Sequence, residues 1–361
     1  MSDHVGRKVI KGRGASLNTA SHRFEEPARE PDGDWRDRAV LVDGPAPPPA
    51  TSITIEQPRS IIARNTSPDV PFDRSVNPWR GCEHGCVYCF ARPTHAFHNL
   101  SPGLDFETRL FAKPTAARLL RAELMKPSYR PAALAMGTNT DCWQPAEERF
   151  GIARAVLGVL AEFGHPVGIV TKSDRVLRDL DILAPMAARG LVHVGISLTT
   201  LDAALARRLE PRAPAPARRL AAIRTLAAAG VPVIAIHAPM IPALNDHELE
   251  RLMEAAAQAG ARTASYIPLR LPHEVAPLFR DWLDAHYPDR ARHVMALVRS
   301  IRDGRDNDPA FGSRMRGTGP YAELLRARFA AARRRFGLDR RLPPLRTDLF
   351  RRPGPEQLRL I

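Results

Sequence analysis

The chain has 361 residues, of which 44% are hydrophobic, enough for one large α/β domain with extensions or for two ordinary domains. It contains no run of about eighteen apolar residues, and its first residues lack the apolar centre of a signal peptide, so the sequence predicts a cytoplasmic protein. The formal net charge of +14 favours a polyanionic partner such as DNA or RNA, although coding bias toward Arg, Ala and Pro explains it equally well.

Residues 1–60 are rich in Pro, Gly, Asp and Arg and show no sustained periodicity, so we expect an extended, partly disordered arm. The segment KGRGA at 11–15 is interpreted either as a solvated tail or as a contact to phosphate. Strand-like alternation begins near Ile53 and recurs at 72–76.

Three of the four cysteines follow this second strand. Cys82, Cys86 and Cys89 form a C-x-x-x-C-x-x-C array. Thiolates are soft ligands for iron–sulfur clusters or zinc, and three so close in sequence can bind one metal centre without help from distant chain. Three ligands on a four-iron cluster leave one iron without a protein ligand, and a reactive site uses such an open position to bind a molecule.

Two other interpretations of the array are weaker. A structural zinc site needs a fourth ligand, for which His84, His95 and His98 are the candidates. A disulfide interpretation fails because three clustered cysteines cannot all pair.

After the array, short apolar runs alternate with amphipathic segments. The predicted strands are 132–138, 166–172, 191–198, 231–240 and 263–269. The predicted helices are 115–126, 145–163, 174–189, 201–209, 215–229 and 246–259. This alternation predicts an α/β fold with a parallel sheet and right-handed crossovers. Six units fit a partial (β/α)6 TIM-like barrel, and the missing G-x-G-x-x-G fingerprint lowers the Rossmann-like alternative.

Polar residues at the carboxyl ends of barrel strands face the site. These ends carry Trp79–Arg80, 137–144, 171–173, 197–200, 237–246 and 266–268. Lys172 is the only lysine after Lys126; it is interpreted as a compact cation for a carboxylate, or as a surface side chain. Ser197 and Thr140 either orient a ligand or cap the next helix.

The cysteine array, with Tyr88 before its last cysteine, resembles the signature of the radical SAM enzymes. These bind S-adenosylmethionine (SAM) to the open iron of a [4Fe-4S] cluster and cleave it to a 5′-deoxyadenosyl radical. Together the strand ends resemble the spore photoproduct lyase-like, DNA-repair branch over residues 70–270. The resemblance implies a six-strand incomplete barrel, the cluster and SAM as cofactors, and an electron donor such as flavodoxin or ferredoxin.

Carried over position by position, the resemblance implies that Cys82, Cys86 and Cys89 hold the cluster and that Tyr88 or Phe90 lies beside the adenine of SAM. Its other implied contacts to SAM are Asn139, Thr140, Asp141, Lys172, Ser197 and His237. We take Lys172 and Cys142 as the candidate catalytic residues.

Two positions depart from the pattern of the lyases. Thr138 stands where they carry a hydrogen-donating cysteine, and Phe90 stands where they carry a tyrosine. Cys142 is interpreted as a relocated hydrogen donor or as a small buried hydrophobe. The departures argue against thymine-dimer cleavage as the reaction.

The rest of the chain predicts helices at 275–286, 289–303 and 321–336. Ten arginines lie between Arg326 and Arg352, and on a segment over the barrel mouth they would suit the phosphate backbone of a nucleic acid. We therefore predict an arm at 1–60, a radical SAM partial barrel at 61–272 and an Arg-rich helical extension at 273–361.

The sequence thus predicts a lyase-like radical SAM enzyme of unknown substrate, with nucleic-acid repair or modification as one candidate. The alternative is a metal- or iron–sulfur-containing protein that binds nucleic acid, or serves as a scaffold, without radical chemistry.

Overall fold

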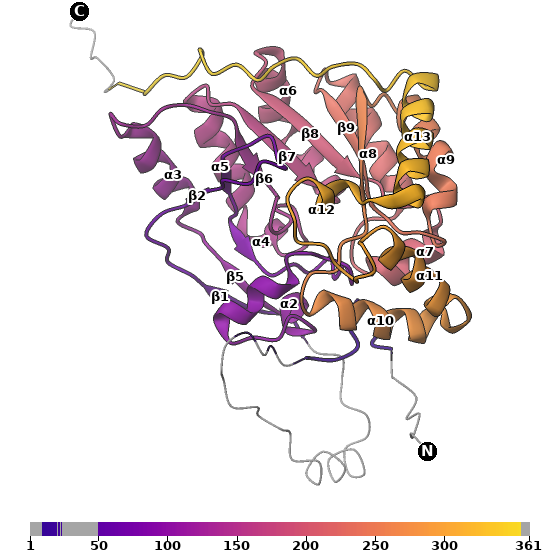
Figure 1. Ribbon diagram of the computed structural model, residues 1–361. Coiled ribbons are helices and arrows are strands. Elements are labelled where there is room, and N and C mark those ends of the chain that lie inside the picture. The colour runs from indigo at the N-terminus through magenta and orange to yellow at the C-terminus, as the bar shows by residue number, and fades with distance from the viewer. Residues whose placement is uncertain (1–8, 20, 22, 24–49, 355–361) are drawn as a thin grey trace, which may run out of the picture.

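The computed structural model describes residues 9–19, 21, 23 and 50–354 (Figure 1). Most of the predicted disordered arm therefore lies outside the described residues. Among the described helices, none is both long enough and apolar enough to cross a bilayer.

The centre of the fold is a seven-stranded sheet of order β10-β9-β8-β7-β6-β3-β2. Its parallel strands are β3 (Arg74–Val76), β6 (Leu134–Met136), β7 (Val167–Thr171), β8 (Val192–Ser197), β9 (Val233–Met240) and β10 (Thr263–Pro268). Only β2 (Ile62–Arg64), at one edge, pairs antiparallel. This confirms the predicted mixed α/β fold with a mostly parallel sheet.

Helices alternate with the strands, as the amphipathic pattern predicts. They are η1 (Arg92–His98), α2 (Asp105–Thr108), α3 (Ala116–Met125), α4 (Glu147–Phe150), α5 (Ile152–Glu162), η2 (Asp174–Asp179), α6 (Leu180–Ala188), α7 (Ala203–Leu209), α8 (Pro216–Ala228), η3 (Asp246–Glu248) and α9 (Leu249–Gln258). The main core lies between strands and helices, where Val194 of β8 is buried in one hydrophobic cluster with Ile223 of α8 and Met253 of α9.

The predicted helix 145–163 is interrupted at Gly151. This glycine has a left-handed φ of 64° and separates α4 from α5. The carboxylate of Glu147 lies at the break and accepts hydrogen bonds from the Ala153 N–H (2.7 Å) and the Trp79 indole N–H (2.9 Å). The helical periodicity continues across the glycine, so the pattern alone did not reveal the break.

A second, three-stranded sheet has the order β1-β5-β4. It consists of β1 (Ser52–Ile55), β4 (Trp79–Arg80) and β5 (Arg109–Ala112). The sequence pattern did not predict β5, whose four residues are too few for a clear period. Because β4 ends just before Cys82, this sheet fixes the entry to the cysteine segment.

The C-terminal helices are α10 (Val275–His286), α11 (Pro288–Ser300), α12 (Ser313–Arg316) and α13 (Gly319–Arg335). Residues 304–318, which we call the strap, connect α11 to α13 and reach the β2–β3 connection. There Arg314 pairs with Asp69 at 2.5 Å, and the Gly312 N–H donates to the same carboxylate at 2.6 Å. Because α13 packs against β10, the strap links the two edges of the large sheet.

After α13, the chain runs along the amino ends of the strands, as the yellow segment across the top of Figure 1. Asp339 bridges to Thr263, the first residue of β10. Further along, the N–H groups of Arg346 and Arg351 donate to carbonyls at 190 and 163, which precede β8 and β7. Residues 338–354 therefore lie at the end of the sheet opposite the mouth, where the strands end.

Candidate functional site

The cysteine segment forms a compact loop between β4 and η1. Its backbone closes successive turns, with the Gly85 N–H donating to the Cys82 carbonyl (3.3 Å) and the Cys89 N–H to the Cys86 carbonyl (3.2 Å). Gly85 has a φ of 66°, and a Cβ there would lie 2.7 Å from a carboxylate oxygen of Glu107. The loop therefore requires glycine at this position.

All three cysteines of the loop are free thiols; Cys82 and Cys86 are buried and Cys89 is partly buried. Burial raises the pKa of Cys82 well above its usual range, and the nearby Asp141, Cys86 and Cys89 add to this. Burial also raises the pKa of Cys86 to about 12, although Lys172 opposes the shift. Since a metal binds thiolates, loading the loop would release protons.

An ion pair supports the loop from behind. Arg92 and Glu107 are both fully buried and pair at 2.5 Å. The Arg92 Nε donates to the Cys86 carbonyl at 2.9 Å, so the pair fixes the loop backbone. A buried pair with its hydrogen bonds satisfied keeps its geometry, because loss of either partner would leave an unpaired charge.

The N-terminal segment packs against the same carboxylate. The N–H groups of Gly14 and Ala15, which are both buried, donate to Glu107 at 3.0 and 2.9 Å. A Cβ on Gly14 would lie 1.7 Å from the Gly85 carbonyl oxygen. The solvated-tail interpretation is therefore wrong for these two residues, and their donors meet a carboxylate of this chain.

Asp141 joins two strand ends to the cysteine loop. Its carboxylate accepts hydrogen bonds from the Thr171 hydroxyl (2.7 Å) and the Lys172 N–H (2.7 Å), and it lies 3.4 Å from His84 Nδ1. Burial alone would raise the pKa of Asp141, but His84 and these donors lower it to about 2. Both oxygens of Asp141 therefore accept hydrogen bonds from neighbouring residues of this chain.

A buried polar network surrounds Tyr88. The Tyr88 hydroxyl and the Arg219 guanidinium both donate to the Glu210 carboxylate, and the Thr199 hydroxyl donates to it at 2.7 Å. Burial would raise the pKa of Glu210, but Arg219 and Lys172 lower it to about 2. Glu210 is therefore a carboxylate in this network, and its negative charge is paired with Arg219.

The ammonium of Lys172 lies above the Tyr88 ring, with Nζ 5.7 Å from the ring centroid. Burial would lower the pKa of Lys172, but Cys86 and Glu210 raise it. Arg219 already pairs with Glu210, so this network has two cations, Arg219 and Lys172, and one carboxylate. The positive charge of Lys172 beside Cys86 is therefore in excess. This excess suits an anionic group at the loop.

Sequence reasoning missed Glu210 and Arg219. Both come from the α7–α8 region, and Arg219 donates to the Ser197 carbonyl at 3.1 Å, which ties them to the end of β8. The only signal in the sequence is that Glu210 directly precedes a proline-rich segment at 211–216. Charged residues in such places are usually exposed to solvent.

Three other predicted residues surround this region with different exposure. Thr140 is buried, and its hydroxyl donates to the Trp79 carbonyl at 2.9 Å. Ser197 is buried with its hydroxyl 3.4 Å from the Ala238 carbonyl, whereas Asn139 is partly exposed.

Phe90, His237 and Cys142 have different surroundings. Phe90 is 53% exposed beside Cys89, at the surface of the loop. His237 is fully buried; its Nδ1 contacts the Leu198 carbonyl at 3.0 Å, and burial lowers its pKa to about 4. Cys142 is fully buried within the main hydrophobic core, so the structure does not bring it to an open surface.

The histidines considered as zinc ligands have other contacts. His84 lies against Asp141, His95 Nε2 is 2.9 Å from the Arg109 carbonyl, and His98 packs on the ring of Phe111 with centroids 4.7 Å apart. Within the described ranges, no group of three or more His, Cys, Asp or Glu side chains is arranged to hold a metal ion.

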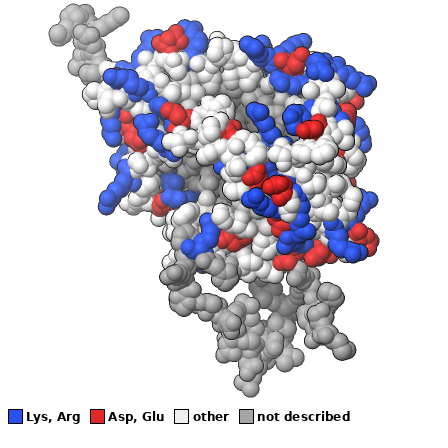
Figure 2. Space-filling view, in the orientation of Figure 1, with Lys and Arg blue, Asp and Glu red and all other residues white. Residues whose placement is uncertain are grey.

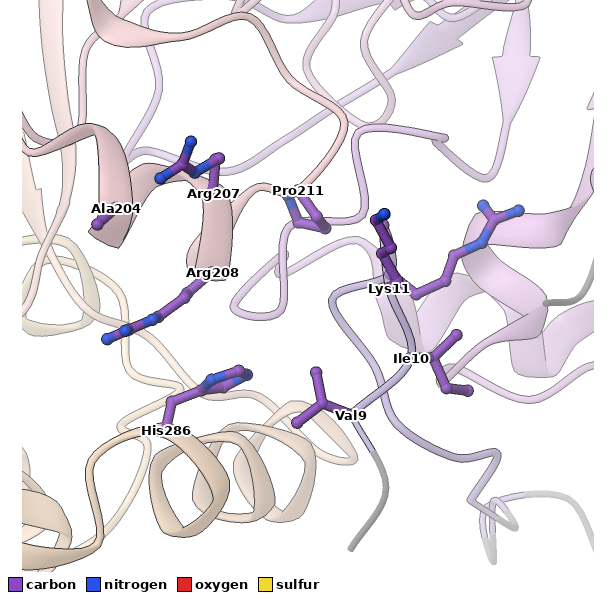
Figure 3. Close-up of a pocket in the computed structure, with 10 residues that line it drawn as sticks. Val9, Ile10, Lys11, Ala204, Arg207, Arg208, Pro211 and His286 are labelled. Atoms are coloured by element: carbon purple, nitrogen blue, oxygen red, sulfur yellow. The ribbon is translucent and has the colours of Figure 1, made fainter. Parts of the chain in front are cut away.

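A pocket of about 220 Å³ lies between the N-terminal segment, α7 and α10 (Figure 3). Lys11, Arg207, Arg208 and His286 are among the residues that line it, together with apolar side chains such as Val9. Lys11, Gly12 and Arg13 of the segment interpreted as a contact to phosphate line this pocket, but none of the residues predicted to bind the cluster or SAM does.

Comparisons with known proteins identify the family. The chain is 36% identical over 318 residues to an uncharacterized protein of Mycobacterium tuberculosis, with 86% of this chain and 90% of that protein covered. It is 25% identical over 214 residues to an uncharacterized protein of Methanocaldococcus jannaschii, covering 59% of this chain and 76% of that one.

Among solved structures, a mutant of spore photoproduct lyase has a similar fold, with a TM-score of 0.53 and 13% identity over 89% of this chain and 87% of that one. Residues 76–256 match the model of the radical SAM superfamily. This chain therefore belongs to the radical SAM superfamily.

Proposed function

We propose that this protein is a radical SAM enzyme whose cysteine loop holds a [4Fe-4S] cluster through Cys82, Cys86 and Cys89. The observation that carries the proposal is this loop: three free thiols in eight residues, held from behind by a buried ion pair, within the part of the chain that matches the superfamily. When bound, the cluster and SAM would supply an electron and a 5′-deoxyadenosyl radical that removes a hydrogen atom from the substrate.

The loop fits such a cluster on chemical grounds. A four-iron cluster takes each thiolate on a different iron, so its ligands surround a volume and do not converge on one point. Cys86 and Cys89 add to the raised pKa of Cys82, which supports the grouping of the three thiols in one loop.

The residues around the loop would position SAM. Lys172 supplies a cation to its carboxylate, and Tyr88 supplies an aromatic face whose hydroxyl is fixed by Glu210. Asn139, Thr140 and Ser197 offer polar groups at neighbouring strand ends, and Asp141 keeps the Lys172 backbone in place. His237 is fully buried with its Nδ1 against the Leu198 carbonyl, so we propose that it acts on SAM indirectly, through the position of the strand end.

We further propose that the six parallel strands form the wall of a partial barrel with the substrate at its mouth. Enclosure protects a carbon radical from solvent, and the strap across the two sheet edges would provide it. The proposal includes Cys142 as a hydrogen donor, which requires the substrate to enter the main core, where Cys142 is buried.

We further propose an electron donor such as flavodoxin or ferredoxin, a nucleic-acid substrate, a lyase-like reaction and a cytoplasmic location.

The surface charge bears on the nucleic-acid substrate. Figure 2 shows Lys and Arg spread over this face, with Asp and Glu among them, so no single basic track marks a nucleic-acid path there. Arg328 pairs with Glu250 at 2.7 Å, and Arg352 donates to the backbone carbonyl at 126 at 2.9 Å.

The test is iron and sulfide content after anaerobic reconstitution. We expect about four of each per chain for a four-iron cluster. Alanine at Cys82, Cys86 or Cys89 should abolish the loading, whereas alanine at Cys142 should leave it intact. Equal loading of all four variants would contradict the proposed ligand set.

A further inference from the structure

Arg270 lies two residues beyond β10, at the end of the sheet where the cysteine loop is found. Its neighbours Leu269 and Leu271 are buried in the same hydrophobic cluster as Cys86 and Tyr88. The guanidinium faces the ring of Phe90, 6.0 Å from its centroid. One of its terminal nitrogens also lies 3.3 Å from the sulfur of Met315 in the strap.

This cation lacks an anionic partner among the described residues. Its one hydrogen bond goes to the thioether of Met315, a weak acceptor, and its Nε is buried without any partner. Of the nearby carboxylates, Asp69 pairs with Arg314, and Asp308 accepts from the Ala310 N–H. Burial of Arg270 and the like charge of Arg314 lower its pKa.

A partly buried guanidinium whose Nε has no partner is costly for the fold, because this donor loses hydration without gaining an acceptor and the charge has no counter-ion. Such a group is explained when a ligand supplies the missing acceptors. The planar fork of arginine matches the paired oxygens of a carboxylate or phosphate. Because Arg270 remains partly exposed, such a group can reach it from solvent.

We propose that Arg270 binds an oxyanion, either phosphate or carboxylate, carried by the substrate. Phe90, with more than half of its surface exposed, provides a flat apolar face next to that oxyanion. The substrate would therefore place its charged group under the strap and its apolar part over the cysteine loop. The identification of the ligand as substrate rests on the proposed function, whereas the binding of an oxyanion does not.

The first test compares the full-length protein with its Arg270→Met and Arg270→Lys variants in urea unfolding. Without oxyanions, in chloride buffer, Arg270→Met should be at least as stable as wild type, because the unpaired charge is gone. Inorganic phosphate or acetate at the same ionic strength should stabilise wild type, but not Arg270→Met. Arg270→Lys should keep only part of the effect, because it keeps the charge and loses the fork.

The matched control is Arg118→Met, which removes an exposed arginine on α3 and should respond to both anions as wild type does. The two anions separate the sources, since a phosphate-bearing substrate predicts the larger shift with phosphate and a carboxylate the larger shift with acetate. An equal shift in Arg270→Met and wild type would overturn the proposal.

The second test measures SAM affinity of the reconstituted protein by equilibrium dialysis. The affinity of Arg270→Met for SAM should lie within about twofold of wild type. A tenfold loss, by comparison, corresponds to about 1.4 kcal/mol of binding free energy. A loss of tenfold or more would overturn the substrate assignment by giving the oxyanion to SAM. If wild type bound no SAM, the proposed function would be wrong. Oxyanion binding by Arg270 would still be decided by the unfolding measurements.

Discussion

The two ends of the large sheet both carry arginines, but in opposite environments. At the carboxyl end, Arg92 and Arg219 are buried and paired with buried carboxylates. At the amino end, Arg346 is about half exposed and pairs with Asp348, two residues away. The buried pairs each join two different elements, Arg92 of η1 to Glu107 of α2 and Arg219 of α8 to the residue after α7, whereas Arg346 pairs within one irregular segment.

This difference shows why charge counts are a poor guide to the site in this chain. A buried charge is costly unless it is paired or hydrogen-bonded, so Arg92 and Arg219 mark places where the fold holds a fixed geometry. Exposed pairs contribute little and are free to vary. The ten arginines counted near the C-terminus therefore say less about function than two arginines hidden under the cysteine loop.

The largest contrast is expected for Arg92→Met. Removing the cation leaves Glu107 buried and unpaired, so we expect a loss of about 3–5 kcal/mol in the free energy of unfolding. Arg346→Gln at the amino end should cause no measurable change. Urea unfolding of both variants measures the difference, and equal effects would remove the distinction between the two ends.

Glu210→Gln should lower stability by about 3 kcal/mol at pH 7, because two cations then lie buried with one carboxylate fewer. The pKa of Glu210 is lowered from 4.5 to about 2 in the folded protein. Its contribution is thus complete above pH 4.5 and is lost as the pH falls toward 2.

The gap between wild type and Glu210→Gln should therefore narrow in acid, as measured by urea unfolding at several pH values. Asp348→Asn is the control at the other end of the sheet. A gap that stayed constant down to pH 3 would show that Glu210 is not held as a carboxylate.

Gly137→Ala should destabilise the fold by about 2 kcal/mol more than Gly190→Ala. Both glycines have left-handed φ values, 81° and 70°. A Cβ at Gly137 would lie 2.0 Å from the Val170 carbonyl oxygen, whereas one at Gly190 would first meet the flexible side chain of Arg346 at 3.4 Å. Thermal unfolding should rank the two variants, and the reverse order would contradict the tight packing at the carboxyl end.

The smallest difference between the two ends is expected for tyrosine: Tyr88→Phe should cost about 2 kcal/mol, because its hydroxyl bonds a charged carboxylate. Tyr129→Phe at the amino end should cost about 1 kcal/mol, since its hydroxyl meets the neutral ring of His165 at 2.7 Å at a partly exposed position, where Arg74 also contacts the ring. Equal losses of unfolding free energy in the two variants would contradict a stronger hydrogen bond at Glu210.

Much of the fold could be predicted from the sequence, because buried parallel strands and amphipathic helices leave clear periodic signals. The strand at 192–197 and the helix at 216–228 both lie inside their predicted ranges. The break at Gly151 was not predicted, because the helical period continues across it. The strand at 109–112 was not predicted, because four residues are too few to show a period.

The candidate site divides in the same way. Cys82, Cys86 and Cys89 stand out because their spacing alone indicates a metal site, so they could be chosen as candidates from a short stretch of sequence. Glu210 and Arg270 could not, because their importance comes from burial and from contacts with segments more than a hundred residues away. Long-range contacts of single charged residues leave no pattern in one sequence.

The most direct measurement is 5′-deoxyadenosine release from SAM by the anaerobically reconstituted protein after dithionite reduction. We expect release by wild type and none by the Cys82→Ala, Cys86→Ala or Cys89→Ala variants. Absence of release from wild-type protein that carries its full iron and sulfide would contradict radical chemistry and favour a scaffold.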